Sequence, residues 1–128
     1  MTLDDNKLNQ LLGQLLEKFI LPKLPVIEGC DPWELTSSVY RGRTRYTLTI
    51  ACSERRRNGY SNHAFAEIWW TGSAFKCAWT HGQGHYYDET AGNTRSFKPT
   101  KGVYVALAQV FAHVRQYAQH DAEIYVIC

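Results

Sequence analysis

A strict alternation of residue types over positions 44–52 constrains the fold of this chain more than any other feature. In the segment TRYTLTIAC, tyrosine, leucine, isoleucine and cysteine occupy the even positions from 46 to 52, and arginine, threonine or alanine occupies the odd positions. Successive side chains of a strand point to opposite faces of a sheet, so this period of two is typical of a strand. The segment predicts a strand with a buried face that includes Leu48 and a half-polar face on the other side.

Several neighbouring segments predict strands that pair with this one. Residues 35–40 precede it and are joined to it by the turn RGR at 41–43. Residues 63–70 and 74–80 flank Thr71, Gly72 and Ser73, and a short glycine turn between two such runs is typical of a β-hairpin. Residues 84–87 predict one more short strand, whereas the composition of 88–99 predicts a loop.

Two helices and a last strand complete the predicted order. Apolar residues recur at helical spacing over 8–20, where Thr2 and Asp5 predict the cap and Pro22 and Pro25 the end. A second helix is predicted over 100–119. Tyr104, Phe111 and Ala118 are expected to help its buried line, which is Val103, Leu107, Val110, Val114 and Tyr117. The β-branched, apolar segment 122–128 predicts a buried C-terminal strand. The chain of 128 residues is therefore predicted to be a single α+β domain, 1–128, with a mostly antiparallel sheet of four or five strands.

Two arginine-rich turns lie at the two ends of the strand over 44–52. That strand spans about 30 Å, so the turns cannot line one pocket, but they can form a stripe along its polar face. The guanidinium group of arginine can donate two hydrogen bonds to phosphate oxygens, and tyrosine rings can stack on bases. These turns therefore predict a surface for nucleic acid or for an acidic protein. The alternative is a pair of solvated turns. The candidate side chains are Arg41, Arg43, Arg45, Arg55, Arg56, Arg57 and Tyr60.

The segment 79–97 predicts a second contact surface because it combines aromatic residues, amides and glycines. Tyrosine, tryptophan and arginine are the residue types that dominate interface hot spots. The candidates here are Tyr86, Tyr87 and Arg95. The alternative is an ordinary connection whose tyrosines cover the core.

Candidates for metal binding or catalysis are few. Cys77, His81 and His85 are spaced by four and have zinc-compatible side chains, but on a strand and a turn this spacing does not bring them together. Cys77 is expected to pack as a small apolar residue. An enzyme would use Glu67 and Asp88 with the two histidines. No phosphate-binding loop, dinucleotide motif or zinc-protease motif is present, so we assign no catalytic residue, no metal ligand and no cofactor.

Charge, cysteine spacing and hydropathy set expectations for location and partners. The formal net charge of +2 excludes a histone-like protein, so any binding of a polyanion depends on local clusters of basic residues. The sequence shows no secretory signal and no apolar run of about 18–20 residues, which predicts no membrane association. The four cysteines form no C-x-x-C pair, which predicts thiols in a reducing cytoplasm.

These features together predict a small, non-catalytic binding protein. It would dock on a nucleic acid or on a nucleic-acid-handling protein through the arginine turns and the aromatic loop. In size and lack of motifs the chain is similar to the small inhibitors that phages and plasmids encode against host defence systems, although no residue motif carries this likeness. The alternatives are the small enzyme, a zinc-binding domain, and a homodimer formed through exposed aromatic residues.

Overall fold

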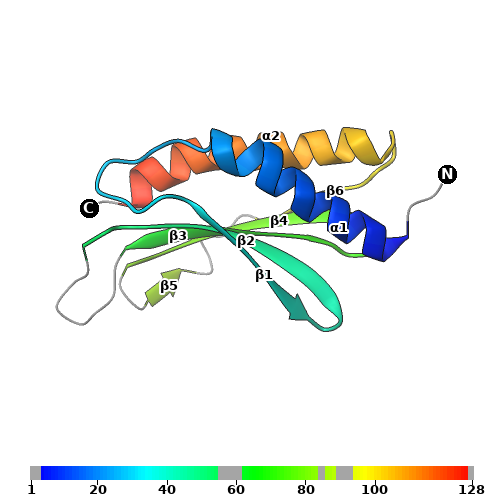
Figure 1. Ribbon diagram of the computed structural model, residues 1–128, viewed down its shortest axis with the longest axis horizontal. Helices are drawn as coiled ribbons and strands as arrows, with labels where there is room; N and C mark the ends of the chain where they lie inside the picture. The colour runs from blue at the N-terminus through cyan, green and yellow to red at the C-terminus, as the bar shows by residue number, and fades with distance from the viewer. Residues whose placement is uncertain (1–3, 55–61, 84–85, 89–93, 127–128) are drawn as a thin grey trace.

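Two helices, α1 (Asp5–Leu15) and α2 (Val103–Tyr125), cover one face of a six-stranded sheet (Figure 1). The computed structural model describes residues 4–54, 62–83, 86–88 and 94–126. Within these ranges no described helix lies on the opposite face of the sheet. The α+β class predicted from the sequence is confirmed.

The sheet is antiparallel throughout its described pairs and runs in the order β1-β2-β3-β4-β5, with β6 also paired to β4. One part of β4 pairs with β5 and the other part pairs with β6, so both short strands share the same side of β4. The strand β6 falls where composition predicts only a loop. The strands are β1 (Glu34–Tyr40), β2 (Arg43–Ala51), β3 (His63–Trp70), β4 (Phe75–Gln83), β5 (Tyr86–Asp88) and β6 (Thr94–Phe97).

The register of the strands places the core between the sheet and the helices. Leu48 stands opposite Leu35 on one side and Ala66 on the other, and Ala66 stands opposite Trp79. Opposite residues in an antiparallel sheet share a face, so these four side chains form one row. Leu48, Ala66 and Trp79 are buried, which confirms the buried face predicted for the strand over 44–52.

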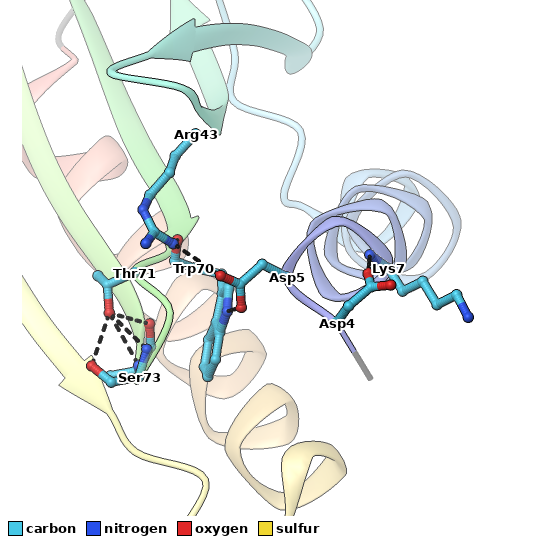
Figure 2. Close-up of polar contacts among 8 residues, drawn as sticks. Asp4, Asp5, Lys7, Arg43, Trp70, Thr71 and Ser73 are labelled. Carbon is cyan, nitrogen blue, oxygen red and sulfur yellow. Dashed lines mark hydrogen bonds and ion pairs between the residues drawn. The ribbon is translucent and has the colours of Figure 1, made fainter. Parts of the chain in front are cut away.

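The first helix begins at a different cap from the predicted one. The side chain of Asp4 accepts a hydrogen bond of 2.7 Å from the backbone N–H of Lys7 (Figure 2). An N-cap carboxylate satisfies one of the donors that a helix start leaves unpaired. The predicted partner of Asp5, Thr2, lies outside the described residues.

The first helix ends in two irregular turns. A π-helical turn, Leu16–Ile20, follows α1, and a 3₁₀ turn, Leu21–Lys23, follows it. Pro22 has no N–H to continue the α-helical ladder, so the helix ends near it as predicted. The π turn changes the direction in which side chains point. Phe19, which the leucine spacing places on the buried stripe, is therefore 46% exposed.

The prediction of a C-terminal strand over 122–128 is wrong, because α2 continues to Tyr125. Residues 127 and 128 lie outside the described part of the chain. Ala118, Ala122 and Val126 are buried and continue at a spacing of four the line that begins at Val110 and Val114. This helical spacing buries an apolar side chain at every turn. The gain from this regular burial is larger than the preference of the few β-branched residues in the last segment for a strand.

The start of the second helix also differs from the prediction. The helix begins at Val103, after Gly102, whose φ of 106° is accessible to glycine but strained for other residues. Tyr104, predicted to help bury the helix, is 71% exposed. Among the described residues, no helix has both the length and the apolar character that a membrane span requires.

Candidate functional site

The sheet face opposite the helices carries aromatic and basic side chains, and we call it the open face. Side chains that alternate with the buried ones on β2 and β3 point to this face, and strand pairing extends it to β1 and β4. On β2, β3 and β4 these side chains are half-buried, whereas those on β1 are exposed. The open face comprises Glu34, Thr36, Ser38, Tyr40, Arg45, Thr47, Thr49, His63, Phe65, Glu67, Trp69, Lys76 and Thr80.

Strand register orders these side chains into rows. Trp69 on β3 stands between Arg45 on β2 and Lys76 on β4, so a cation flanks the indole on each side. Phe65, four residues along β3, stands between Thr49 and Thr80. At about 3.3 Å per residue the two aromatic positions are separated by about 13 Å. The open face therefore offers two aromatic rings along one strand, one flanked by cations and the other by hydroxyls.

Arg45 is held in place by its neighbours. Its guanidinium carbon lies 4.6 Å from the centroid of the Tyr40 ring and 4.2 Å from that of Trp69. Its Nη1 donates to Oε2 of Glu67 at 3.2 Å. Cation–π contacts and the carboxylate fix the guanidinium plane and neutralise part of its charge. Arg45 thus orders Tyr40 and Trp69 into a rigid group instead of remaining a solvated cation.

Arg43 stands opposite Tyr40 at the start of β2, but its guanidinium reaches the first turn of α1 and does not join the rows of the open face. Its Nη1 lies 3.7 Å from Oδ2 of Asp5 and donates to the backbone oxygen of Trp70 at 3.5 Å (Figure 2). Its guanidinium also lies against Gly72, where a side chain would meet it at about 3.0 Å. Arg43 therefore links the start of β2 to the first turn of α1 and to the β3–β4 turn.

The Trp70 indole completes this anchor. Its Nε1 donates to Oδ1 of Asp5 at 2.8 Å, and the side chain itself is 5% exposed (Figure 2). Asp5 also lies in the first turn of α1, where a negative charge interacts favourably with the helix dipole.

Replacing Asp5 by Ala is expected to lower the free energy of unfolding by about 1–3 kcal/mol, because it leaves the Trp70 N–H without an acceptor in a buried setting. Chemical denaturation monitored by tryptophan fluorescence measures this change. Asn6→Ala, one residue along the same exposed turn, is the matched control and should stay within about 0.5 kcal/mol of the wild type. An equal, small effect for both variants would contradict the proposed anchor.

The remaining arginine and tyrosine candidates fall in different places. Arg41 is exposed at the β1–β2 turn, has a φ of 51°, and lies 5.3 Å from the Tyr40 ring. In the described part of the chain no carboxylate lies within ion-pair distance of Arg41, so it is the available cation of the first cluster. Arg95 on β6 stands opposite Cys77 and so points to the helix side of the sheet.

Other predicted residues are only partly placed. Tyr86 and Tyr87 stand opposite Gln83 and Gly82 in the β4–β5 pairing. The candidates over 55–60 lie outside the described residues. The structure therefore brings Tyr40, Arg41 and Arg45 together, does not group Arg43 or Arg95 with them, and leaves the second arginine cluster a prediction.

The strand pairing places Glu67, His81 and Asp88 of the enzyme alternative on three different strands. Glu67 lies on the open face and pairs with Arg45, and it stands opposite Ala78. Asp88 stands opposite His81, three residues further along β4, and β4 itself separates β5 from β3. His85 lies outside the described ranges. The strand pairing thus places Glu67 and Asp88 on strands that are not neighbours.

The cysteines differ from one another in their chemistry. Cys77 is buried on the helix side of the sheet, and this burial raises the pKa of its thiol to about 12. A metal ligand or nucleophile needs a thiolate, which this site disfavours. Over the described residues no three His, Cys, Asp or Glu side chains gather closely enough to hold a metal ion. Cys52 is disulfide-bonded, so the prediction that all four cysteines are thiols is wrong at this position.

A cleft of about 410 Å³ lies on the helix side of the sheet, between α1 and β1. Tyr46 forms part of its wall and donates through its hydroxyl to the backbone oxygen of Asn9 at 2.7 Å. Burial raises the pKa of the Tyr46 phenol. The cleft is lined by Gln10, Gly13, Gln14, Glu17, Leu21, Leu35, Thr36, Ser37 and Tyr46.

Sequence reasoning did not select Trp69, Phe65 or Lys76 as site residues. The hairpin and its aromatic residues are visible in the sequence, but the pairing of β2 with β3 decides which tryptophan faces the arginine. Trp69 belongs to the open face, whereas its neighbour Trp70 belongs to the core. Alternation along β3 was the available signal, because Ala64, Ala66 and Ile68 mark the buried face.

Comparisons of the chain with protein-family models, with curated proteins and with solved structures find no match. No relative therefore supplies a function for the open face or for the cleft. What these surfaces do must be inferred from their own residues.

Proposed function

We propose that this protein is a non-catalytic binding protein that docks single-stranded nucleic acid on the open face of its sheet. The observation that carries the proposal is the position of Trp69 between Arg45 and Lys76 on a sheet face that no described helix covers. Exposed sheet faces that present aromatic rings are a recurrent platform for unpaired bases.

The chemistry of the open face fits bases as well as phosphates. A base stacked on an aromatic side chain contributes about 1–3 kcal/mol, whatever its identity. Trp69 and Phe65 supply two such rings about 13 Å apart, a spacing that an extended strand of nucleotides can follow. Threonine hydroxyls at Thr49 and Thr80 flank Phe65 and can bond to bases or sugars.

The charge available to phosphates is modest. Glu67 neutralises Arg45 in part, so the cations that can face a phosphate are Arg41, Lys76 and, as a prediction, Arg55–Arg57. Each phosphate contact on a single strand makes the slope of log affinity against log salt steeper, by about −0.7. We therefore expect a shallow salt dependence and a larger contribution from stacking.

Binding of labelled oligonucleotides across a salt series tests this proposal. Single-stranded RNA or DNA should bind about tenfold or more tightly than a duplex of the same sequence, because base pairing hides the faces that Trp69 and Phe65 would contact. Absence of binding at low salt, or equal affinity for the duplex, would contradict the proposal.

The second arginine cluster has its own expected result. Replacing Arg55, Arg56 and Arg57 by Ala should make the salt slope shallower by about 2 and leave thermal stability nearly unchanged. A control with the same change of charge replaces three exposed cations on the helix side, Lys18, Lys23 and Arg115. The control should bind as the wild type does. An unchanged slope in the Arg55–Arg57 variant would mean that this turn is solvated or docks a protein.

A nucleic-acid-handling or acidic protein is the second candidate partner. Tyrosine, tryptophan and arginine form the hot spots of protein interfaces, and Arg45 contacts both Tyr40 and Trp69. Protein binding without oligonucleotide binding would favour this candidate. It would also suit the proposed setting, a phage- or plasmid-encoded inhibitor of a host defence system.

The disulfide at Cys52 and the proposed cytoplasmic location imply different redox states for this residue. Disulfides are rare in the reducing cytoplasm, and Cys52 is disulfide-bonded. A cytoplasmic protein would therefore carry Cys52 as a thiol. Mass measurement of alkylated protein from cells distinguishes the two forms.

A further inference from the structure

The strand β1 is an edge of the sheet that lacks the usual protection. It pairs with β2 on one side, and among the described residues no strand pairs with its other side. Natural edge strands are commonly blunted by lysine, proline or a bulge. The sequence of β1, ELTSSVY, contains neither lysine nor proline, and its pairing with β2 is continuous over seven residues.

The helix side of β1 is also uncovered toward its end. Val39 points to the same side as Leu35, yet it is 74% exposed. The cleft between α1 and β1 lies beside Leu35 and Ser37. Val39 thus leaves apolar surface exposed on an edge whose backbone groups are available to pair with another strand.

The sequence of β1 is complementary to itself in antiparallel orientation. A two-fold axis through Ser37 is the arrangement that pairs all seven residues of β1 with those of a second copy. It places Val39 of each copy opposite Leu35 of the other, so the exposed valine covers a half-buried leucine at the cleft. It also places the hydroxyls of Thr36 and Ser38 opposite each other.

Charge supports the same register. Glu34 stands opposite Tyr40 of the second copy, next to the exposed Arg41 that follows it. The two ends of β1 thus bring a carboxylate toward a guanidinium twice, once at each end of the interface. Shifting the two-fold axis by one residue would move Val39 opposite Ser37 or Trp33 and leave part of β1 unpaired.

We propose that the protein forms a homodimer by antiparallel pairing of β1 with β1 of a second copy, centred on Ser37. The two sheets then become one continuous sheet, and the open faces of both copies lie on the same side. The dimer exists independently of any nucleic-acid partner, so its test does not depend on the proposed function.

Sedimentation over a concentration series tests the interface. The wild type should shift from 14.7 kDa toward twice that mass as its concentration rises to about 1 mM. Val39→Asp places a carboxylate against Leu35 of the other copy and should remain monomeric. Val26→Asp is the matched control, because Val26 is 99% exposed and lies outside β1. It should dimerise as the wild type does.

Two results would overturn the proposal. One is a wild-type mass of 14.7 kDa at every concentration. The partner of β1 would then be a strand of a different protein. The other is a Val39→Asp variant that dimerises as strongly as the Val26→Asp control, which would place the interface elsewhere.

A charge exchange tests the register itself. Glu34→Arg alone and Arg41→Glu alone each place like charges at both ends of the dimer and should weaken it by about tenfold. Mixing the two variants creates a heterodimer with opposite charges at both ends, so the mixture should recover wild-type mass behaviour. Failure of the mixture to associate more strongly than either variant would contradict the register centred on Ser37.

Discussion

Replacing Leu48 by Ala is expected to lower the free energy of unfolding by about 2–5 kcal/mol. The side chain has no exposed surface and stands between Leu35 and Ala66 in the core row. Ala66 cannot extend into the space that the substitution leaves, so a cavity remains and adds to the lost burial. Urea denaturation followed by circular dichroism measures the change.

Thr49→Ala is the control for Leu48→Ala, because Thr49 is the next residue of β2 and points to the open face. Its effect should lie within about 1 kcal/mol, the scale of a half-exposed strand position. A loss below about 0.5 kcal/mol for Leu48→Ala would mean that the two faces of β2 are reversed, and it would place the aromatic row on the wrong side of the sheet.

Gly13→Ala should destabilise the protein by about 1–3 kcal/mol, although alanine is the better helix former. A Cβ at position 13 would lie 2.5 Å from the ring of Tyr46, which packs directly on the helix. The ring would have to move, and the hydrogen bond from Tyr46 to the Asn9 oxygen would be lost with it. These costs outweigh the gain of about 1 kcal/mol that alanine brings to a helix interior.

A double-mutant cycle separates the two terms for Gly13. In a Tyr46→Ala background the close contact is gone, so adding Gly13→Ala should stabilise the protein by up to about 1 kcal/mol. Gln14→Ala, an exposed neighbour on the same helix, should change stability by less than about 0.5 kcal/mol in either background. Destabilisation by Gly13→Ala in both backgrounds would show that the Tyr46 ring is not the cause.

Local periodicity was sufficient to predict most of the fold. The alternation around Leu48 gave the correct buried face, and the hairpin around Gly72 has the predicted first strand, His63–Trp70. The errors lie where two signals compete. The last seven residues are β-branched enough for a strand, but the spacing from Val110 to Val126 keeps them helical through Tyr125. Phe19 fits the leucine spacing of α1, but the π turn over Leu16–Ile20 changes the direction in which its side chain points.

The candidate site depended on pairing between distant strands, which a single sequence does not specify. The sequence places the arginines of the first cluster near one end of β2, and the structure gives each of them different contacts. Arg43 anchors α1 through Asp5, Arg45 stacks between Tyr40 and Trp69, and Arg41 remains exposed. These differences follow from the β2–β3 register and from how α1 docks on the sheet. Neither the β2–β3 register nor the docking of α1 can be predicted from composition or from residue spacing.

The affinity of Trp69→Ala for a single-stranded oligonucleotide is the most direct test of the proposed stacking of bases on the open face. A labelled single-stranded oligonucleotide at low salt is titrated with the wild type, Trp69→Ala and Tyr104→Ala. Tyr104 is an aromatic residue on α2 that is 71% exposed, so its loss controls for a general loss of aromatic surface. Stacking on Trp69 predicts that Trp69→Ala binds about 5- to 150-fold more weakly, whereas Tyr104→Ala binds as the wild type does. Equal affinities for the wild type and Trp69→Ala would contradict it.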